Sequence, residues 1–131
     1  MSVSFFMPDA PTEKREPYPE DEPGYMEERP VAPFTELNMA NSNAVAILAV
    51  IDPGADYTGG RWEGEKLERV FKRTMKALNR GATVSSLTLP ARQEGNFYEG
   101  GRDVEYVTRR LTEMAELLRV AIQHRMAVNY G

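Results

Sequence analysis

Two copies of the tripeptide Gly-Gly-Arg are the residues of this 131-residue sequence best suited to bind an anion. They occupy positions 59–61 and 100–102, and each lies just before a segment predicted to be helical. At a helix start, free backbone N–H groups and the positive end of the helix dipole attract anions, and glycine permits close approach. An adjacent arginine can add a bidentate contact to phosphate or carboxylate. Neither stretch matches a phosphate-binding loop or a dinucleotide fingerprint, and Gly-Gly also occurs in plain turns. The candidate ligand-binding residues here are Gly60, Arg61, Gly101 and Arg102.

A further candidate is Asn41, in a segment with three asparagines between positions 38 and 43. Leu37, Asn41 and Ala44 fall at the spacing of one helix face, so helix packing is expected to bury the Asn41 amide in part. A buried amide must be hydrogen-bonded. Two roles remain open for it: a polar anchor that reaches a ligand, or an amide that satisfies the backbone of a loop.

Catalytic and metal-binding patterns are sparse. The sequence has no cysteine, which excludes disulfides, thiolate nucleophiles and zinc fingers, and a single histidine, His124. A general base at His124 would need a nucleophile and an orienting carboxylate, and no spacing in the sequence supplies them. The acidic residues do not follow a calcium-loop pattern either. We therefore predict a non-enzymatic protein with no catalytic residue, no metal site and no cofactor.

Residues 1–33 differ in composition from the rest of the chain. They hold seven of the nine prolines, and eight acidic residues against three basic ones. Proline removes backbone donors and favours extended geometry in the residue before it, so this segment is predicted to form an extended, acidic arm with no long helix and no central strand. A flexible tail is one interpretation. The other is an arm whose aromatic side chains dock on the rest of the chain or on a partner, and of these two we favour a partner. The candidate partner-binding residues are Phe5, Phe6, Tyr18 and Tyr25.

Residues 34–131 are predicted to form a compact body with three helices. The first covers about residues 35–50 and the second about residues 62–79, where acids come early and bases late, as the helix dipole favours. The third begins after Asp103, a good N-cap residue. On this third helix an apolar stripe begins at Val104 and includes Leu111 and Leu118, seven residues apart. We expect both leucines to be deeply buried.

Short β-strands are predicted between and after the last two helices. Residues 83–89 are rich in β-branched side chains and are followed by Pro90, and residues 96–99 can pair with them across a turn. Residues 126–130 can form a third strand. The predicted fold class is therefore α+β, with three helices packed on a short two- to three-stranded antiparallel sheet, preceded by the extended proline-rich arm.

The body resembles small uncharacterised proteins encoded by bacteriophages and prophages. The resemblance is carried by the segment Phe-Thr-Glu-Leu-Asn-Met-Ala-Asn-Ser-Asn-Ala at 34–44, by Gly-Arg-Trp at 60–62, by a Gly-Gly-Arg, by Arg-Arg-Leu at 109–111 and by the terminal Val-Asn-Tyr-Gly at 128–131. It excludes the arm and implies no particular chemistry. What it implies is a context: a small phage-type accessory, virion or host-directed protein in a bacterial cytoplasm.

Charge and hydropathy narrow the range of partners. The formal net charge of −4 argues against an overall basic nucleic-acid binder. The longest apolar run, at 44–51, is far shorter than the roughly 20 residues that cross a bilayer. We therefore expect a protein partner (a host protein, a virion protein or a second copy), no membrane and no nucleic acid. The favoured function is a non-enzymatic interaction protein that binds another macromolecule through its arm and body, in the cytoplasm or in the virion. The alternative is a binder of a small, nucleotide-like anion at the Gly-Gly-Arg helix starts.

Overall fold

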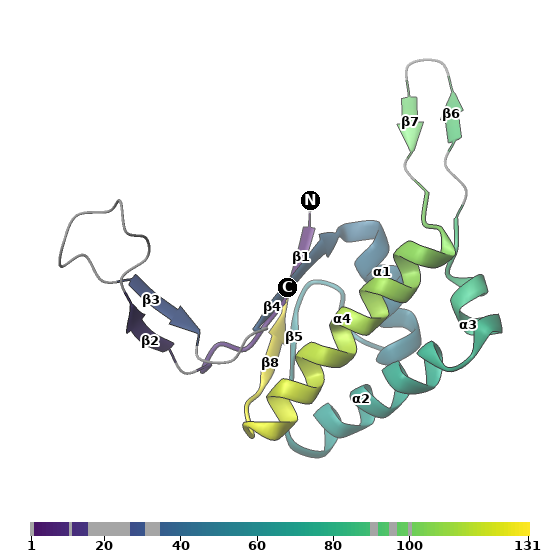
Figure 1. Cartoon of the computed structure of the whole chain (residues 1–131). Helices are drawn as coiled ribbons and strands as arrows, with labels where there is room; N and C mark the ends of the chain where they lie inside the picture. The colour runs from purple at the N-terminus through teal and green to yellow at the C-terminus, as the bar shows by residue number, and fades with distance from the viewer. Residues whose placement is uncertain are drawn as a thin grey trace.

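The computed structural model describes residues 2–10, 35–89 and 101–131 in full. It also describes the backbone of four further strands: β2 (Thr12–Arg15), β3 (Glu27–Pro30), β6 (Arg92–Glu94) and β7 (Phe97–Glu99). β2 pairs with β3 and β6 pairs with β7, each as an antiparallel hairpin. The body of the fold is built by the remaining elements (Figure 1).

A four-stranded antiparallel sheet forms one layer of the molecule, in the order β4-β1-β8-β5. Its strands are β1 (Ser2–Phe6), β4 (Glu36–Ala40), β5 (Gly60–Trp62) and β8 (Val128–Tyr130). The N-terminal strand is central, because Phe5 pairs with Leu37 of β4 on one side and with Tyr130 of β8 on the other. The last residue continues this pairing, since Ser4 and Gly131 exchange backbone hydrogen bonds of 3.0 and 3.1 Å.

Alternating side chains explain why these segments are strands. In β1, Val3 and Phe5 are buried while Ser2 and Ser4 are not. In β4 the same alternation buries Leu37 and Met39 and exposes the residues between them. A period of two places apolar residues on one face of a sheet and polar residues on the other. The helices therefore cover one face of the sheet, and its other face is polar.

Four helices form the second layer in the described part of the chain. They are α1 (Asn41–Ile51), α2 (Gly64–Leu78), α3 (Gly81–Ser86) and α4 (Val104–Gln123). The N-cap of α4 is Asp103, whose carboxylate accepts a 2.7 Å hydrogen bond from the Tyr106 backbone N–H, as predicted. After α4 the chain turns back toward β8 through Arg125, which has a φ of 54°. The backbone N–H of Met126 donates to the Ala121 carbonyl across this turn, an arrangement that satisfies the last carbonyls of a helix.

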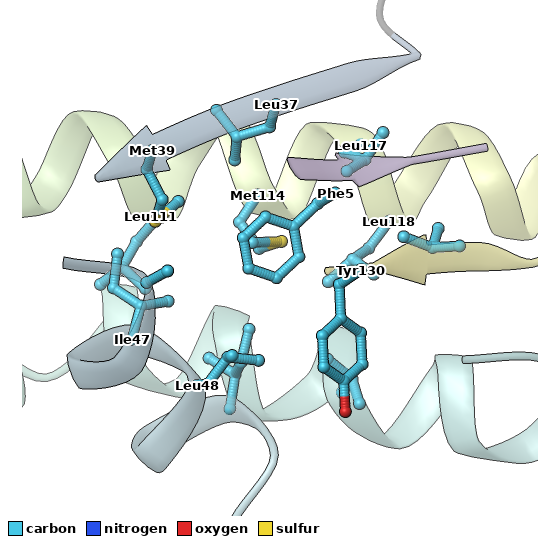
Figure 2. Packing of buried hydrophobic residues seen from close by; sticks show 14 of the residues in the cluster. Phe5, Leu37, Met39, Ile47, Leu48, Leu111, Met114, Leu117, Leu118 and Tyr130 are labelled. Atoms are coloured by element: carbon cyan, nitrogen blue, oxygen red, sulfur yellow. The ribbon is translucent and has the colours of Figure 1, made fainter. Parts of the chain in front are cut away.

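The core lies between the two layers (Figure 2). Leu111 and Leu118 of α4 are both 0% exposed, which confirms the prediction for this stripe. From the sheet, the Phe5 ring stacks on Trp62 at 5.8 Å and on Tyr130 at 5.9 Å between ring centroids. The predicted α+β class is correct. The details differ from expectation in three places.

The predicted arm is the first difference. Residues 1–33 were expected to hold no central strand, but Ser2–Phe6 is the strand on which β4 and β8 both depend. The reason is that the prolines begin only at Pro8, so the first residues keep all their backbone donors. The proposed boundary at residue 33 therefore does not separate this strand from the body. Much of the remaining arm, including Tyr18 and Tyr25, lies outside the described residues.

The first predicted helix is the second difference. Residues 36–40 are β4, and the helix starts only at Asn41. Leu37 fits the helical spacing of Ala44 and Leu48 by coincidence. Within the strand, the residue that shares its buried face is Met39, two positions further along. Cross-strand pairing with Phe5 and Val3 decides the local conformation. In the same way Trp62, expected at the start of the second helix, is the last residue of β5.

The segment at 83–89 is the third difference, because Gly81–Ser86 is the helix α3 rather than a strand. Its buried residues, Val84 and Leu87, are three apart, which is a helical spacing. Side-chain hydroxyls support the helical turns: Ser86 donates to the Thr83 carbonyl and Thr88 to the Ser85 carbonyl, each at 2.7 Å. The predicted strand at 96–99 corresponds to β7, but its partner is β6, and the predicted last strand is β8.

Candidate functional site

The two Gly-Gly-Arg copies have different structural roles. Gly60 and Arg61 belong to β5, so this copy does not form a helix start. A Cβ atom at Gly60 would collide with the Tyr130 ring, which explains the glycine by packing. Arg61 lies at the polar face of the sheet, where its Nη1 donates to Asn129 Oδ1 at 3.3 Å and its Nε to Glu63 Oε2 at 3.2 Å. The expectation that this copy lies at a helix start is wrong.

Asn41 does not reach a ligand site either. It is the first residue of α1 and is exposed, because the buried face of that helix begins only at Ala44. The expectation that packing would bury its amide is therefore wrong. Arg61 and Arg102 line two different cavities, and Asn41 lines neither of them. The three residues do not converge on one ligand.

The second Gly-Gly-Arg does lie beside a helix start, and its arginine is part of a polar network. Arg102 forms a two-residue antiparallel bridge with Leu89 immediately before α4. Its side chain, half-buried, donates from Nε to the Leu87 carbonyl at 2.9 Å and from Nη1 to Asn43 Oδ1 at 3.1 Å. The Asn43 amide in turn donates to the Tyr106 hydroxyl at 2.9 Å. One asparagine of α1 thus fixes both an arginine and a tyrosine at the start of α4.

The network continues along α4 through Arg110. One turn after Tyr106, this residue donates to the Tyr106 hydroxyl at 3.4 Å, to Glu113 at 2.9 Å and to the Asn38 carbonyl of β4. Burial alone would lower the pKa of Arg110, but hydrogen bonding and charge from Tyr106 and Glu113 outweigh burial and raise it. Arg110 therefore remains a cation. The guanidinium groups of Arg109 and Arg110 lie 5.5 and 5.7 Å from the Tyr106 ring centroid, within cation–π range.

An open cavity of about 710 Å³ lies beside this network. It is lined by Thr88, Leu89, Gly101, Arg102, Asp103, Val104, Glu105, Tyr106 and Arg109, and we call it the α4 groove. Leu89 is 36% exposed and Val104 is 55% exposed, so the groove presents apolar surface to solvent. Val104 was expected to begin the buried stripe of α4. It lies at the first position of the helix and lines the groove instead.

The α4 groove combines charged side chains with exposed apolar ones. Arginines and carboxylates lie beside an apolar wall. Of the two hydroxyls that line the groove, that of Thr88 donates to the Ser85 carbonyl and that of Tyr106 accepts from Asn43 and Arg110. The helix start carries a fixed carboxylate, because Asp103 already accepts the Tyr106 N–H. Within the described ranges, no three histidine, aspartate or glutamate side chains are grouped so that they could hold a metal ion.

A second cavity, of about 840 Å³, lies at the other end of α4. His124 lines it together with Arg61, Arg125 and four acidic residues. The histidine is exposed, and in the described part of the chain it makes no side-chain hydrogen bond to a hydroxyl or a carboxylate. Nothing here assembles a base, a nucleophile and an orienting group, which general-base catalysis requires.

The aromatic residues proposed for partner binding divide into three cases. Phe5 is 0% exposed and packs in the core, so it is not available to a partner, and that expectation is wrong. Phe6 is 36% exposed and faces away from the core. Tyr18 and Tyr25 lie outside the described residues.

The site residues that sequence reasoning missed are Asn43, Tyr106 and Arg110. The spacing of Tyr106 and Arg110, four apart on a clear helix, was a usable signal for a side-chain pair. The pairing of Asn43 with Arg102 joins positions 59 residues apart and has no local signal. Comparison of the chain with protein-family models, with curated proteins and with solved structures finds no match.

Proposed function

We propose that this protein is a non-enzymatic, phage-type interaction protein that binds a segment of a protein partner in the α4 groove. The observation that carries the proposal is the exposed apolar wall of Leu89 and Val104 beside two side chains, Arg102 and Tyr106, that Asn43 already holds in place. An open surface of this kind is typical of a binding site for another protein.

The composition of the groove matches the centre of a protein interface. Tyrosine and arginine are enriched at the residues that dominate binding energy, and apolar side chains surround them. Tyr106 and Arg102 are both hydrogen-bonded to Asn43, so their positions are fixed before a partner arrives. Such preorganisation lowers the entropy lost on binding. A partner segment could therefore place an apolar side chain against Leu89 and Val104 with little rearrangement.

Arg102 supports a polar contact with the same segment. Of the five N–H groups of its guanidinium, one on Nε and one on Nη1 are engaged by Leu87 and Asn43 among the described residues. The remaining N–H groups can donate hydrogen bonds to a carboxylate or carbonyl oxygen of the partner. Arg109, 63% exposed at its side chain, adds a second cation at the rim. Because Asp103 and Glu105 also line the groove, these contacts favour a partner segment that combines an apolar side chain with a neutral hydrogen-bond acceptor, such as a backbone or amide carbonyl.

A small anion at the start of α4 is the alternative, and Arg102 with Gly101 is the observation in its favour. Two features count against it. The Asp103 carboxylate occupies the helix start that would attract the anion, and Glu105 places a second negative charge beside it. A free nucleotide would be repelled by both groups.

Where the protein acts is part of the same proposal. None of the helices in the described ranges is long and apolar enough to cross a membrane. Together with the phage resemblance, this favours the bacterial cytoplasm, or the virion, as the place where the partner is met.

The experiment compares Val104→Glu with the matched control Thr112→Glu. Both side chains are exposed on α4, both changes add one negative charge, and only position 104 lines the groove. The full chain and both variants are used to capture proteins from a bacterial lysate, with quantitative mass spectrometry as the measurement. A protein retained by the wild type and by Thr112→Glu but lost by Val104→Glu supports the proposal. Equal retention by all three contradicts it, and saturable binding of ATP that Arg102→Gln abolishes favours the alternative.

A further inference from the structure

The exposed face of α2 carries a row of cations that neither the core nor the α4 groove uses. The row consists of Arg69, Lys72, Arg73, Lys76 and, just after the helix, Arg80, and we call it the α2 stripe. All five side chains are exposed. No acidic residue occurs in the sequence between Glu68 and Glu94. Within the described residues, none of the five takes part in a salt bridge or a side-chain hydrogen bond.

Helix geometry gathers these charges on one line. Residues three and four apart are neighbours on a helix surface, roughly 5–6 Å apart at their Cβ atoms. Arg69 is therefore next to Lys72 and Arg73, and each of those is next to Lys76. From Arg69 to Lys76 the row extends about 10 Å along the helix axis. Each like-charged pair costs the helix a few tenths of a kcal/mol. Cations late in α2 suit the helix dipole, but that effect is confined to the last turn and does not account for Arg69, Lys72 and Arg73.

The lack of apolar groups on the α2 stripe decides what class of partner fits it. The centre of a protein interface is depleted of lysine and needs apolar or aromatic anchors. The buried residues of α2 face the core, and Met75, 37% exposed, is the one large hydrophobic residue of this helix that is open to solvent. A phosphate backbone needs only positive charge and no apolar anchor. The stripe therefore fits nucleic acid better than it fits an acidic protein surface.

The aromatic content of α2 decides between duplex and single-stranded nucleic acid. Binding of single strands relies on exposed aromatic side chains on which bases stack. The one aromatic residue of α2, Phe71, is half-buried against the core. Binding of a duplex does not need exposed aromatic side chains, because its bases are already stacked on one another. The α-helix of about 10–12 Å diameter also matches the roughly 12 Å wide major groove of B-DNA, whereas the major groove of duplex RNA is too narrow for side chains to read.

We propose that the α2 stripe is a docking surface for the phosphate backbone of duplex DNA, bound without sequence preference. The net charge of −4 led to the opposite expectation, but net charge averages over the molecule. Eight acids lie in residues 1–33, far along the sequence from the stripe. Glu65 and Glu68 border the stripe at its N-terminal end, four residues before Arg69 and Lys72, and no acid neighbours its C-terminal part from Arg73 to Arg80. A local cationic surface can bind DNA within a Debye length while the whole chain remains acidic.

The test measures the affinity of the full chain for a fluorescent, random-sequence DNA duplex as the salt concentration changes. If all five cations contact phosphates, log K falls against log salt with a slope of about −4.5. Between about 50 and 150 mM salt the affinity then falls roughly 100-fold. The variant Lys72→Gln/Lys76→Gln removes two phosphate contacts, so its slope is expected to be about −2.7. Its affinity then falls only about 20-fold over the same salt range. Glutamine keeps the helix propensity of lysine, and circular dichroism verifies the fold.

A matched control makes the same change in net charge at two positions outside the α2 stripe. Arg61→Gln/Arg119→Gln removes two exposed cations from β5 and α4. This variant is expected to keep the wild-type slope. Poly-glutamate and phosphatidylserine vesicles serve as competing probes.

The outcomes decide the proposal in either direction. A reduced slope in the Lys72→Gln/Lys76→Gln variant, together with an unchanged slope in the control, supports duplex binding by the stripe. No binding to duplex DNA at the lowest salt overturns the proposal, and so does an equal slope in all three proteins. Preference for poly-glutamate would assign the stripe to an acidic polypeptide, and preference for vesicles would assign it to a membrane surface. Either result overturns the assignment to DNA.

Discussion

At the scale of single residues, two asparagines two positions apart in α1 have opposite roles. Asn43 is half-buried and bonds both Arg102 and Tyr106, whereas Asn41 is exposed at the start of the helix. Sequence spacing pointed to Asn41, because it lay on an apparent apolar face that included Leu37. That face does not exist, since Leu37 belongs to a strand. The difference between the two amides is measurable.

Asn43→Ala should lower the free energy of unfolding by about 1–3 kcal/mol, because the change removes the half-buried hydrogen bonds of Asn43 to Arg102 and Tyr106. Asn41→Ala is the matched control and should change it by less than about 0.5 kcal/mol, as exposed substitutions do. Denaturant titration of both variants measures the difference. Equal losses at the two positions would show that the network does not contribute to the native state.

Gly60 offers a second test at this scale. Its role here is to leave room for the Tyr130 ring, so Gly60→Ala should destabilise the fold by about 1–3 kcal/mol through overpacking. Replacing Tyr130 by leucine as well should remove most of the added penalty, which a double-mutant cycle measures. If Gly60 had served as an anion contact, the two changes would act independently.

At the scale of elements, local signals predicted some segments and failed for others. The 3.6-residue period and the Asp103 cap predicted α4 well, because helix contacts are local and both signals lie within the segment itself. Strand β1 could not be found in this way. Its partners, Leu37 and Tyr130, are far along the sequence, and pairing partners in a sheet leave no local trace. In α3, tertiary packing of Val84 and Leu87 overrides the β-propensity of Thr83 and its neighbours.

The same limits apply to the candidate site. Arg102 was identified from its position before a helix, and the structure does place it at a cavity. Its hydrogen-bond partners were not predictable, because Asn43 reaches it from another helix. Arg61 has the same local sequence but a different environment, since the strand that contains it pairs with β8. Identical tripeptides therefore have different structural roles, one in a strand and one beside a helix start.

The α2 helix provides the prediction at this scale. Arg73→Glu places an acid between Arg69 and Lys76, so it replaces two like-charge contacts by two attractive ones. The free energy of unfolding should stay the same or rise by about 0.5 kcal/mol, measured by thermal denaturation at low salt. The same variant removes one cation and adds one acid, so its affinity for duplex DNA should fall about as far as that of Lys72→Gln/Lys76→Gln. A clear loss of stability would show that the cations of α2 are needed for folding, and the α2 stripe would then have no separate role to explain.

At the scale of the whole molecule, the N-terminal residues belong to the core of the body. The predicted division into an arm at 1–33 and a compact body at 34–131 implies a body that folds without the arm. The structure instead places β1 between β4 and β8, so that removing it would divide the sheet. A chain without this strand would expose the apolar faces of Leu37, Met39 and Tyr130 and should aggregate.

Phe5 and Phe6 provide a matched test of whether β1 belongs to the core. They are adjacent in sequence, yet Phe5 is 0% exposed and Phe6 is 36% exposed. Phe5→Ala should lower the free energy of unfolding by about 3–5 kcal/mol, as for an aromatic residue removed from a filled core. Phe6→Ala should lower it by less than about 1 kcal/mol. Chemical denaturation of the two variants distinguishes a core strand from an arm, for which both losses would be small.

The central claim is that the α4 groove binds a protein partner, and site-specific photo-crosslinking tests it most directly. A photoreactive amino acid is placed at Val104, which lines the groove, and in a parallel protein at Thr112, which is exposed on the same helix outside it. Both proteins are irradiated in living bacterial cells, and the adducts are identified by mass spectrometry. The account predicts a defined protein adduct at position 104 that is absent at position 112. The same adducts at both positions, or none at position 104, would contradict it.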